Sequence, residues 1–469
     1  MRRLRALPLF LVALIVLGQA APVLASGAPA ADPAHASPAQ LGPTVVVVVL
    51  DGCPAGSLDF LPDGAFLGAA GRDCDCGDGQ GIGCADSSCL STVVRTVFPS
   101  STAAGHAAVF TGSYPEENGV TGKEYLLDDG SPGRFSSPGV LERPTLFEAA
   151  RAAGYGTAMM SAKKNVRLML SGAADVSVGA EEAPDWILSA AGPPPDESEQ
   201  YADFAGWHVK LDLWVLSTVR AYLESNYAPA LIGVNLGSPD KCGHRYGPAP
   251  AGETAAAIAA MSEGLEALAA TLDATRAGNW CLIVTADHGM TQVDKGITVL
   301  DIIDEVAEST GSEITATLDG GVLYVWAEGE AQYELAKALA GTEGVAEVIG
   351  PGGPEGSEGA DCPDCPDCPD GAKDQKDQAR RAQLRIRHPR TAPLIAVVQP
   401  GYMFIESPLF MDYTRGSHGT ADLDSDVLVP LIICGPEARS GKAQQLLSAA
   451  HSVTDIYGIA MDLLNSPPN

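Results

Sequence analysis

Basic residues are scarce in this sequence of 469 residues. It contains 29 Lys and Arg residues against 59 Asp and Glu residues, so its formal net charge at pH 7 is −30. Because such a negative surface repels polyanions, the composition argues against a nucleic-acid polymer or an anionic membrane as the partner. Any anionic ligand would need a binding site that is locally positive.

Long apolar segments are also missing after the N-terminal region, so we expect no membrane-spanning segment there. Residues 1–25 combine Arg2, Arg3 and Arg5 with a short apolar run and small residues, the pattern of a cleaved signal peptide. An uncleaved anchor is the alternative, but Pro22 and the shortness of the run favour cleavage. We therefore expect a periplasmic or extracellular protein that begins at Ser26. Cleavage leaves 26 basic against 59 acidic side chains, a balance of −33.

The cleavage site lacks a cysteine, which argues against a lipid anchor. The 11 cysteines of the chain suit an oxidising compartment, although their odd number leaves at least one unpaired or intermolecular. A Gly-rich insert, residues 71–91, is predicted to be a disulfide-stapled loop and contains Cys74, Cys76, Cys84 and Cys89.

A second insert, residues 351–383, is rich in Gly, Pro and Asp and then in charged residues. It contains an Asp-Cys-Pro repeat with Cys362, Cys365 and Cys368. The spacing is like that of an iron–sulfur site, but a fourth nearby cysteine is missing. We therefore predict a flexible surface loop.

Apolar residues make up 46% of the chain, enough for a sizeable core. Short runs without polar alternation are separated by amphipathic stretches such as residues 145–154 and 255–275. The runs are Val45–Leu50, Gly156–Ser161, Leu231–Leu236 and Cys281–Thr285. Strands of this kind are buried on both faces, so the pattern predicts an α/β fold, a three-layer αβα sandwich around a mostly parallel sheet.

We expect residues 26–42 to be disordered and residues 43–469 to form a single catalytic domain. Within that domain, the runs at residues 394–398 and 427–436 are predicted to add edge strands to the sheet.

Polar side chains with metal-binding or catalytic chemistry follow each buried run. In open parallel sheets the ligand site lies beyond the carboxyl ends of the strands, so one site would collect them. They are Asp51, Lys163, Asp240, His244, Asp287 and His288.

The Asp and His residues of this set, together with His418, suit zinc without any thiolate. Singly, each is more typical of a hydrogen-bonded structural residue. Their repeated occurrence directly after buried strands favours ligation. Six such residues complete two metal shells only if a bridging group contributes.

The motif order gives a resemblance. Asp51 after the first strand is followed by residues 98–120 (FPSSTAAGHAAVFTGSYPEENGV), 239–244 (PDKCGH), 286–289 (ADHG) and 416–420 (GSHGT). From about Val45 to Pro436 the sequence resembles the alkaline phosphatase superfamily, within it the type I phosphodiesterase and nucleotide pyrophosphatase branch. The resemblance implies an alkaline-phosphatase-like fold.

The resemblance also implies roles for individual residues. Thr102 is the nucleophile, and the two zinc ions, or other divalent metals, divide the ligands. One takes Asp51, Thr102, Asp287 and His288, and the other takes Asp240, His244 and His418. Independently, Thr102 begins a small-residue helix whose N-terminus favours phosphate, whereas Ser100 and Ser101 lie too early and are predicted to be turn residues. We expect His106 to be structural.

Two departures from the family concern substrate binding. Lys123 stands where many diesterases carry an Asn. Lys163 matches the first cation of a two-cation stretch that phosphonoacetate hydrolases carry, but this sequence has Asn165 at the position of the second cation. If both lysines reach the site, the dianion of a monoester or phosphonate is favoured. If they point to solvent, a diester is favoured. The loss of the pair at Asn165 leads us to prefer the diester.

The sequence therefore predicts an exported two-zinc phosphodiesterase or nucleotide pyrophosphatase with a phospho-threonine intermediate. Its partner would be a small phosphorylated molecule such as a nucleotide or a phosphodiester, with no membrane after signal cleavage. The alternatives are a phosphomonoesterase or phosphonoacetate hydrolase on the same scaffold and, from another class, an inactive metal-binding protein.

Overall fold

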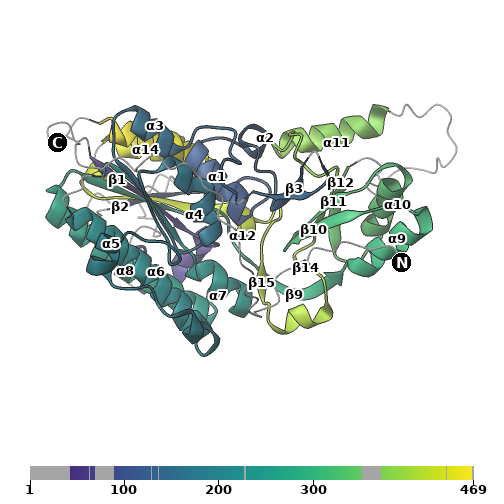
Figure 1. Cartoon of the computed structure of the whole chain (residues 1–469), viewed down its shortest axis with the longest axis horizontal. Helices are drawn as coiled ribbons and strands as arrows, with labels where there is room; N and C mark the ends of the chain where they lie inside the picture. The colour runs from purple at the N-terminus through teal and green to yellow at the C-terminus, as the bar shows by residue number, and fades with distance from the viewer. Residues whose placement is uncertain are drawn as a thin grey trace, which may run out of the picture.

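A computed structural model of the chain describes residues 43–466 apart from 63, 69–88, 128, 136, 226–228, 351–370 and 440 (Figure 1). The predicted signal peptide and the segment 26–42 lie outside the described residues. So do Cys74, Cys76, Cys84 and the Asp-Cys-Pro repeat.

A seven-stranded sheet forms the centre of the larger part of the molecule. Its strand order is β2 (Cys89–Arg95), β16 (Leu428–Cys434), β8 (Trp280–Thr285), β1 (Thr44–Leu50), β7 (Leu231–Leu236), β5 (Thr157–Ser161) and β6 (Val176–Val178). β1 contains five consecutive valines, all fully buried, and lies parallel to both β7 and β8. β-Branched side chains without polar alternation suit a strand covered on both faces. The four predicted strands and the α/β fold class are confirmed.

The predicted edge strands were wrong. The run at residues 427–436 forms β16, which lies inside the sheet, antiparallel to β8 on one side and to β2 on the other. The run at residues 394–398 forms β13 (Leu394–Val398) of a different sheet. Both runs are buried and apolar, and apolarity alone does not reveal which strands will be neighbours.

Helices cover both faces of the central sheet (Figure 1). One layer contains α1 (Thr102–Thr111), α3 (Leu146–Ala152) and α14 (Asp455–Leu464), and the other contains α5 (Asp185–Ala191), α6 (Phe204–Glu224) and α8 (Gly252–Arg276). Phe110 of α1 stacks on Phe147 of α3 with ring centroids 5.3 Å apart. Gly233 of β7 makes room for this pair, because a Cβ atom there would lie 2.6 Å from the Phe147 ring.

By length and composition, α8 is the one helix in the described ranges that could cross a membrane. Such a helix is weak evidence of a membrane protein, because core helices pass the same test. Ile258, Met261, Leu265, Leu268 and Leu272 of α8 are buried in the main hydrophobic core.

A smaller four-stranded antiparallel sheet lies beside the central one (Figure 1). Its order is β10 (Thr315–Asp319), β11 (Val322–Trp326), β13 and β12 (Val345–Ile349). α9 (Leu300–Thr310) and α10 (Gly329–Ala340) pack on one face and share its core. Next to it, β14 (Gly401–Ile405), β9 (Thr291–Thr298) and β15 (Gly416–Ser417) form a three-stranded sheet. Other elements include α2 (Pro115–Asn118), the hairpin β3 (Glu124–Leu126) and β4 (Pro132–Arg134), and α13 (Gly441–Ala449).

Part of the predicted flexible insert is helical. Residues 371–383 form α11 (Gly371–Gln383), whereas residues 351–370 lie outside the described ranges. Within α11, Arg381 forms an ion pair of 2.9 Å with Asp377 one turn earlier, and Arg380 pairs with Glu347 of β12. Composition suggested a loop, but these charged residues are good helix formers that find partners.

Cys89 does not belong to a self-contained stapled loop. It begins β2 and forms a disulfide with Cys434 at the end of β16, its direct partner in the antiparallel register. The predicted insert boundary at residue 91 therefore runs into the sheet. The bond joins segments 345 residues apart.

Candidate active site

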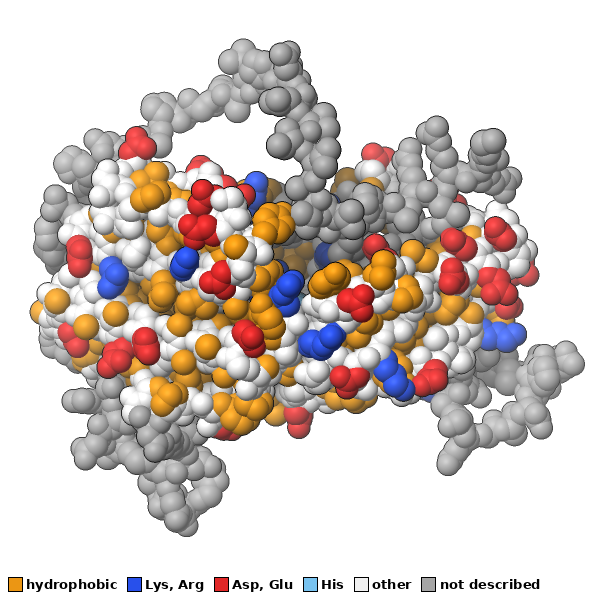
Figure 2. Space-filling model, turned by 90° about the horizontal axis from the view of Figure 1, so that it is seen from below, with side chains coloured by type: hydrophobic (Ala, Val, Ile, Leu, Met, Phe, Trp, Pro, Cys, Tyr) orange, Lys and Arg blue, Asp and Glu red, His pale blue; other side chains and the backbone are white. Residues whose placement is uncertain are grey.

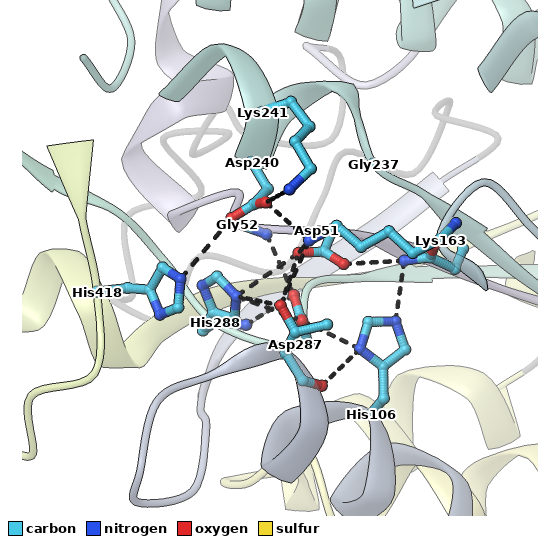
Figure 3. A network of polar contacts seen from close by, with 12 residues as sticks. Asp51, Gly52, His106, Lys163, Gly237, Asp240, Lys241, Asp287, His288 and His418 are labelled. Atoms are coloured by element: carbon cyan, nitrogen blue, oxygen red, sulfur yellow. Dashed lines mark hydrogen bonds and ion pairs between the residues drawn. The ribbon is translucent and has the colours of Figure 1, made fainter. Parts of the chain in front are cut away.

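Loops at the carboxyl ends of β1, β7 and β8 bring the predicted metal ligands together (Figure 3). Asp51 follows β1 and Asp240 lies in the first turn of α7 (Ser238–Tyr246), after β7. Asp287 and His288 follow β8. All four are buried. His418 reaches the same place from the loop after β15.

Thr102 is the first residue of α1, as predicted. Its Oγ1 atom lies 3.3 Å from three groups: Asp51 Oδ1, His288 Nε2 and Lys163 Nζ. Ser101 is the N-cap in extended conformation. The Ser100 hydroxyl donates to the Thr420 carbonyl at 2.8 Å, so it ties the turn before α1 to the loop that carries His418.

The small residues of α1 let the helix approach the loop after β8 very closely. A Cβ atom on Gly105 would lie 2.2 Å from the backbone oxygen of Asp287. Glycine at this position therefore brings the start of α1, and Thr102 with it, against Asp287.

Three histidines, His244, His288 and His418, present their Nε2 atoms to the site. Nδ1 of His244, His288 and His418 contacts a backbone oxygen of Gly416, Gly289 and Ser100, at 2.9, 2.7 and 2.9 Å. Because a carbonyl oxygen only accepts, each Nδ1 carries the proton and each Nε2 keeps a lone pair. That arrangement is typical of metal-binding histidines.

The free nitrogens meet carboxylate oxygens. His244 Nε2 lies 3.2 Å from Asp240 Oδ1, and His418 Nε2 lies 3.8 Å from the same atom. His288 Nε2 lies 3.6 Å from Asp51 Oδ1 and 3.5 Å from Asp287 Oδ2. Ligand atoms of Asp240, His244 and His418 all lie within 4.8 Å of one another, and so do those of Asp51, Asp240 and His288.

Two buried carboxylate oxygens support a cation at these clusters. Asp240 Oδ1 and Asp287 Oδ2 accept no hydrogen bond in the described part of the chain. His106 Nδ1 lies 3.0 Å from Asp287 Oδ2, but it also lies 2.9 Å from the Thr102 carbonyl, which needs its proton. A buried anionic oxygen without a donor is costly unless a cation balances it.

The pKa directions follow from this crowding of charges. Burial and Asp287 raise the pKa of Asp51, although Lys163 opposes them. Burial would also raise the pKa of Asp240, but Lys163 and His244 outweigh it and hold that pKa well below its usual value. Burial and the neighbouring His288 lower the pKa of His418. The directions for Asp240 and His418 favour an ionised carboxylate beside a neutral imidazole, the forms that bind metal.

Asn235 of β7 was missed by the sequence analysis. Its side-chain nitrogen donates to Asp51 Oδ2 at 3.0 Å and contacts His106 Nε2 at 3.0 Å, while its oxygen accepts from the Lys163 backbone N–H at 3.2 Å. His106, predicted to be structural, is fully buried in this network; its ligand atom also lies within 4.8 Å of those of Asp51 and Asp287. The available signal was an Asn inside an otherwise apolar strand.

Asp426 of α12 (Asp424–Val427) was also missed. It accepts from the backbone N–H and the hydroxyl of Thr420 at 3.1 and 2.7 Å, and from the hydroxyl of Thr291. These bonds join the loop after His418 to the start of β9, which follows His288. Asp426 thereby positions one histidine relative to the other.

Lys163 reaches into the centre of the site. Its ammonium donates to Asp51 Oδ1 at 2.6 Å and to Asp240 Oδ2 at 2.7 Å (Figure 3). It also contacts Thr102 Oγ1. Its side chain is 14% exposed. The hydrogen bond from the Lys163 backbone N–H to Asn235 holds the loop after β5 beside the loops that carry Asp51 and Asp240.

The other two predicted substrate-binding residues line the same cavity, which has a volume of about 510 Å³. Lys123 Nζ lies 3.5 Å from the Leu318 carbonyl, and Asn165 is exposed on α4 (Lys164–Leu170). The cavity also includes Lys241 and Asp319, which the sequence analysis did not single out.

Solved structures with this fold include two kinds of enzyme. Phosphonoacetate hydrolase from Sinorhizobium meliloti 1021, in complex with phosphonoacetate, matches with a TM-score of 0.61 and 18% identity over 90% of this chain and 96% of that chain. Murine ectonucleotide pyrophosphatase/phosphodiesterase 5, in complex with AMP, matches with a TM-score of 0.58 and 18% identity over 91% and 97%. At this identity the likeness describes the fold.

No curated protein matches the sequence. The family described as Type I phosphodiesterase / nucleotide pyrophosphatase matches residues 45–421, most of the chain. This match agrees with the clusters of Asp and His side chains at the carboxyl ends of the strands. The chain therefore belongs to the type I phosphodiesterase/nucleotide pyrophosphatase family and is a metal-dependent phosphoric ester hydrolase.

Proposed function

We propose that this chain is an exported two-zinc phosphodiesterase or nucleotide pyrophosphatase that acts through a phospho-threonine intermediate on Thr102. The observation that carries the proposal is the convergence on Thr102 Oγ1 of Asp51, His288 and Lys163, each at 3.3 Å. Ser100 is bonded to the Thr420 carbonyl, and Ser101 Oγ is buried without a hydrogen-bond partner in the described ranges. These contacts support Thr102 as the attacking hydroxyl.

The donor set supports two zinc sites. Asp51, Asp287, His288 and the Thr102 oxygen would hold one ion, and Asp240, His244 and His418 the other. When bound, zinc lowers the pKa of the threonine hydroxyl and balances charge on the phosphoryl oxygens. The three carboxylates of Asp51, Asp240 and Asp287 supply the negative charge, which suits divalent ions.

The chain's own residues bind and orient the phosphoryl group. Ser101, Thr102 and Ala103 line the cavity, so the free backbone N–H groups in the first turn of α1 lie at its wall. The Lys163 ammonium adds positive charge beside the attacking oxygen. Thr102 would attack phosphorus, the ester oxygen would leave, and water would then release the phosphoryl group from Thr102.

The test compares three single variants of the zinc-loaded enzyme on an aryl diester. Thr102→Ala should abolish turnover, whereas Ser100→Ala and Ser101→Ala should fold and retain most of it, because only one hydroxyl is placed for attack. A phosphorylated residue trapped by rapid quench should map to Thr102. Equal losses at Ser101 and Thr102, or a label on serine, would refute the assignment.

One observation favours a second candidate, a phosphomonoesterase or a phosphonoacetate-type hydrolase. Lys163 reaches the site rather than solvent, which adds a cation for a dianionic phosphoryl or phosphonate group. Rates on an aryl diester, an aryl monoester and phosphonoacetate, measured with the same zinc-loaded preparation, separate the two candidates.

Export rests on the predicted signal peptide and is supported by the Cys89–Cys434 disulfide, which suits an oxidising compartment. We propose a small phosphorylated substrate as the partner, and no membrane association after cleavage. N-terminal sequencing of the protein recovered from outside the cytoplasm should begin at Ser26. Recovery only as an intact chain in the cytoplasm would contradict export.

A further inference from the structure

Lysines are concentrated in the active-site cavity of an otherwise acidic protein. The chain contains ten lysines, and four line this one cavity: Lys123, Lys163, Lys164 and Lys241. Figure 2 shows acidic side chains spread over one face of the molecule, with fewer Lys and Arg side chains among them. The same cavity is lined by three carboxylates, Asp212, Asp240 and Asp319, so its lysines outnumber them by one in a chain of net charge −30, which favours an anionic ligand.

Lys241 enters the cavity from α7, directly after Asp240. Its Nζ atom lies 3.7 Å from Asp240 Oδ2, and Lys163 Nζ lies 2.7 Å from the same oxygen (Figure 3). The two ammonium nitrogens are therefore at most 6.4 Å apart, the sum of these two distances. Two cations from distant parts of the sequence thus converge beside the metal-binding loops.

The charge of Lys241 is the less compensated of the pair. Lys163 donates to both Asp51 and Asp240, whereas Lys241 has one ion-pair contact in the described part of the chain, the long one to Asp240. Another carboxylate of the cavity wall, Asp212, already accepts from the backbone N–H groups of Gly237 and Ser238. The Lys241 side chain is 41% exposed, so a ligand can reach its ammonium.

We propose that Lys241 and Lys163 together bind a second anionic group of the substrate, next to the phosphoryl group that reacts at Thr102. This inference rests on the proposed function and names its substrate class. An anionic oxygen accepts from an ammonium at about 2.8 Å, so the oxygens of one carboxylate or phosphate group can reach two nitrogens that are at most 6.4 Å apart. Lys241 thereby supplies the second cation that is missing at the position of Asn165.

The remainder of the cavity sets the size of the substrate. Its volume of about 510 Å³ is in the range of organic ligand sites, and its lining includes the apolar residues Val166, Met169, Trp207 and Leu211. The substrate class is therefore an organic compound in which a carboxylate or a second phosphate closely follows the reacting phosphorus. Both sources share the same chemistry at the lysine pair.

The experiment compares zinc-loaded wild type with Lys241→Met and Lys241→Arg, and uses Lys295→Met as the control. Lys295 is an exposed lysine of β9 that pairs with Glu343 outside the cavity, so its loss removes the same charge elsewhere. The substrates are bis(4-nitrophenyl) phosphate, without a second anionic group, phosphonoacetate, with a carboxylate, and ADP, with a second phosphate. A parallel binding assay by calorimetry uses inorganic phosphate and pyrophosphate.

Lys241→Met should raise KM for phosphonoacetate, for ADP or for both about tenfold, with kcat changed less than twofold. The compound affected identifies the second group as a carboxylate or a phosphate. Bis(4-nitrophenyl) phosphate should be unaffected, Lys241→Arg should retain most of the affinity, and Lys295→Met should resemble wild type. Pyrophosphate binding should weaken about tenfold in Lys241→Met while phosphate binding does not.

Equal effects of Lys241→Met on all three substrates, or none, together with unchanged pyrophosphate affinity, would overturn the inference. If the wild type hydrolyses none of the substrates, the proposed function fails instead. The pyrophosphate-binding assay still tests whether Lys241 and Lys163 bind a second anionic group in that case, because it measures binding without turnover.

Discussion

The side-chain nitrogen of Asn235 donates a hydrogen bond of 3.0 Å to Oδ2 of Asp51. The same nitrogen contacts His106, which in turn lies against Asp287 and the Thr102 carbonyl. One buried amide thus connects two carboxylates, those of Asp51 and Asp287, with the helix that begins at Thr102. Asn235 is not among the expected metal ligands, but it contacts one of them, Asp51, and the neighbouring His106.

Replacing Asn235 with Leu should weaken zinc binding about tenfold to a hundredfold, because residues that orient metal ligands have effects of this size. Chelator competition measures the affinity. Thr218→Val, which removes a buried hydroxyl of α6 away from the site, is the control and should leave zinc affinity unchanged. Unaltered zinc binding in Asn235→Leu would show that Asp51 holds its position without the amide.

Lys163→Ala should reduce kcat/KM for an aryl monoester by roughly 2 kcal/mol, about thirtyfold, since it removes a charge beside the attacking oxygen. The loss for an aryl diester should be at least tenfold smaller, because a diester brings less negative charge. Steady-state kinetics with both esters measure the difference. Lys210→Ala, an exposed lysine paired with Glu199, should match wild type. Equal losses on both esters would assign Lys163 to positioning rather than to charge discrimination.

Gly105→Ala should lower the free energy of unfolding by about 3 kcal/mol, because the new methyl group would meet the Asp287 backbone oxygen at 2.2 Å. Urea denaturation measures the change. Gly458→Ala in α14 is the matched control: a Cβ atom there meets nothing within 4 Å. That helix should gain about 0.5 to 1 kcal/mol. Equal stability of the two variants would mean that α1 can move away from the loop after β8.

Burial lowers the pKa of His208 to about 3, with Lys241 and Lys163 adding to the effect. The unfolded chain binds this proton near the ordinary value of 6.5 and the folded chain does not, so stability falls as pH falls from 6.5 toward 3. Between pH 7 and pH 5 this group should cost about 2 kcal/mol. Urea denaturation at the two pH values should show a smaller difference in His208→Gln. An unchanged difference would show that His208 is already protonated in the folded protein.

Much of the fold could be read from the sequence because burial leaves a direct trace in it. Strands covered on both faces need continuous apolar runs, and four such runs became β1, β5, β7 and β8. Their neighbours were not predictable in the same way. β13 and β16 are both buried apolar strands but lie in different sheets, because strand pairing depends on the path of the whole chain.

The candidate site divides in a similar manner. Asp51, Asp240, His244, Asp287 and His288 directly follow strands, so their meeting place follows from the parallel sheet alone. Asn235 and Asp426 carry no such mark, and Lys241 stands between Asp240 and His244 but is not a metal-binding residue type. Their contacts exist only where two loops or a strand and a helix approach each other.

The sequence by itself determined the layered α/β fold, the family and the set of Asp and His side chains, since these depend on local runs, short motifs and residue chemistry. Only the tertiary structure decided that Lys163 turns inward to Thr102, that Cys89 pairs with Cys434, and that Lys241 joins Lys163 at Asp240. The physical reason is that side-chain direction and long-range contact are set by packing between segments far apart in the chain. Local composition does not record that packing.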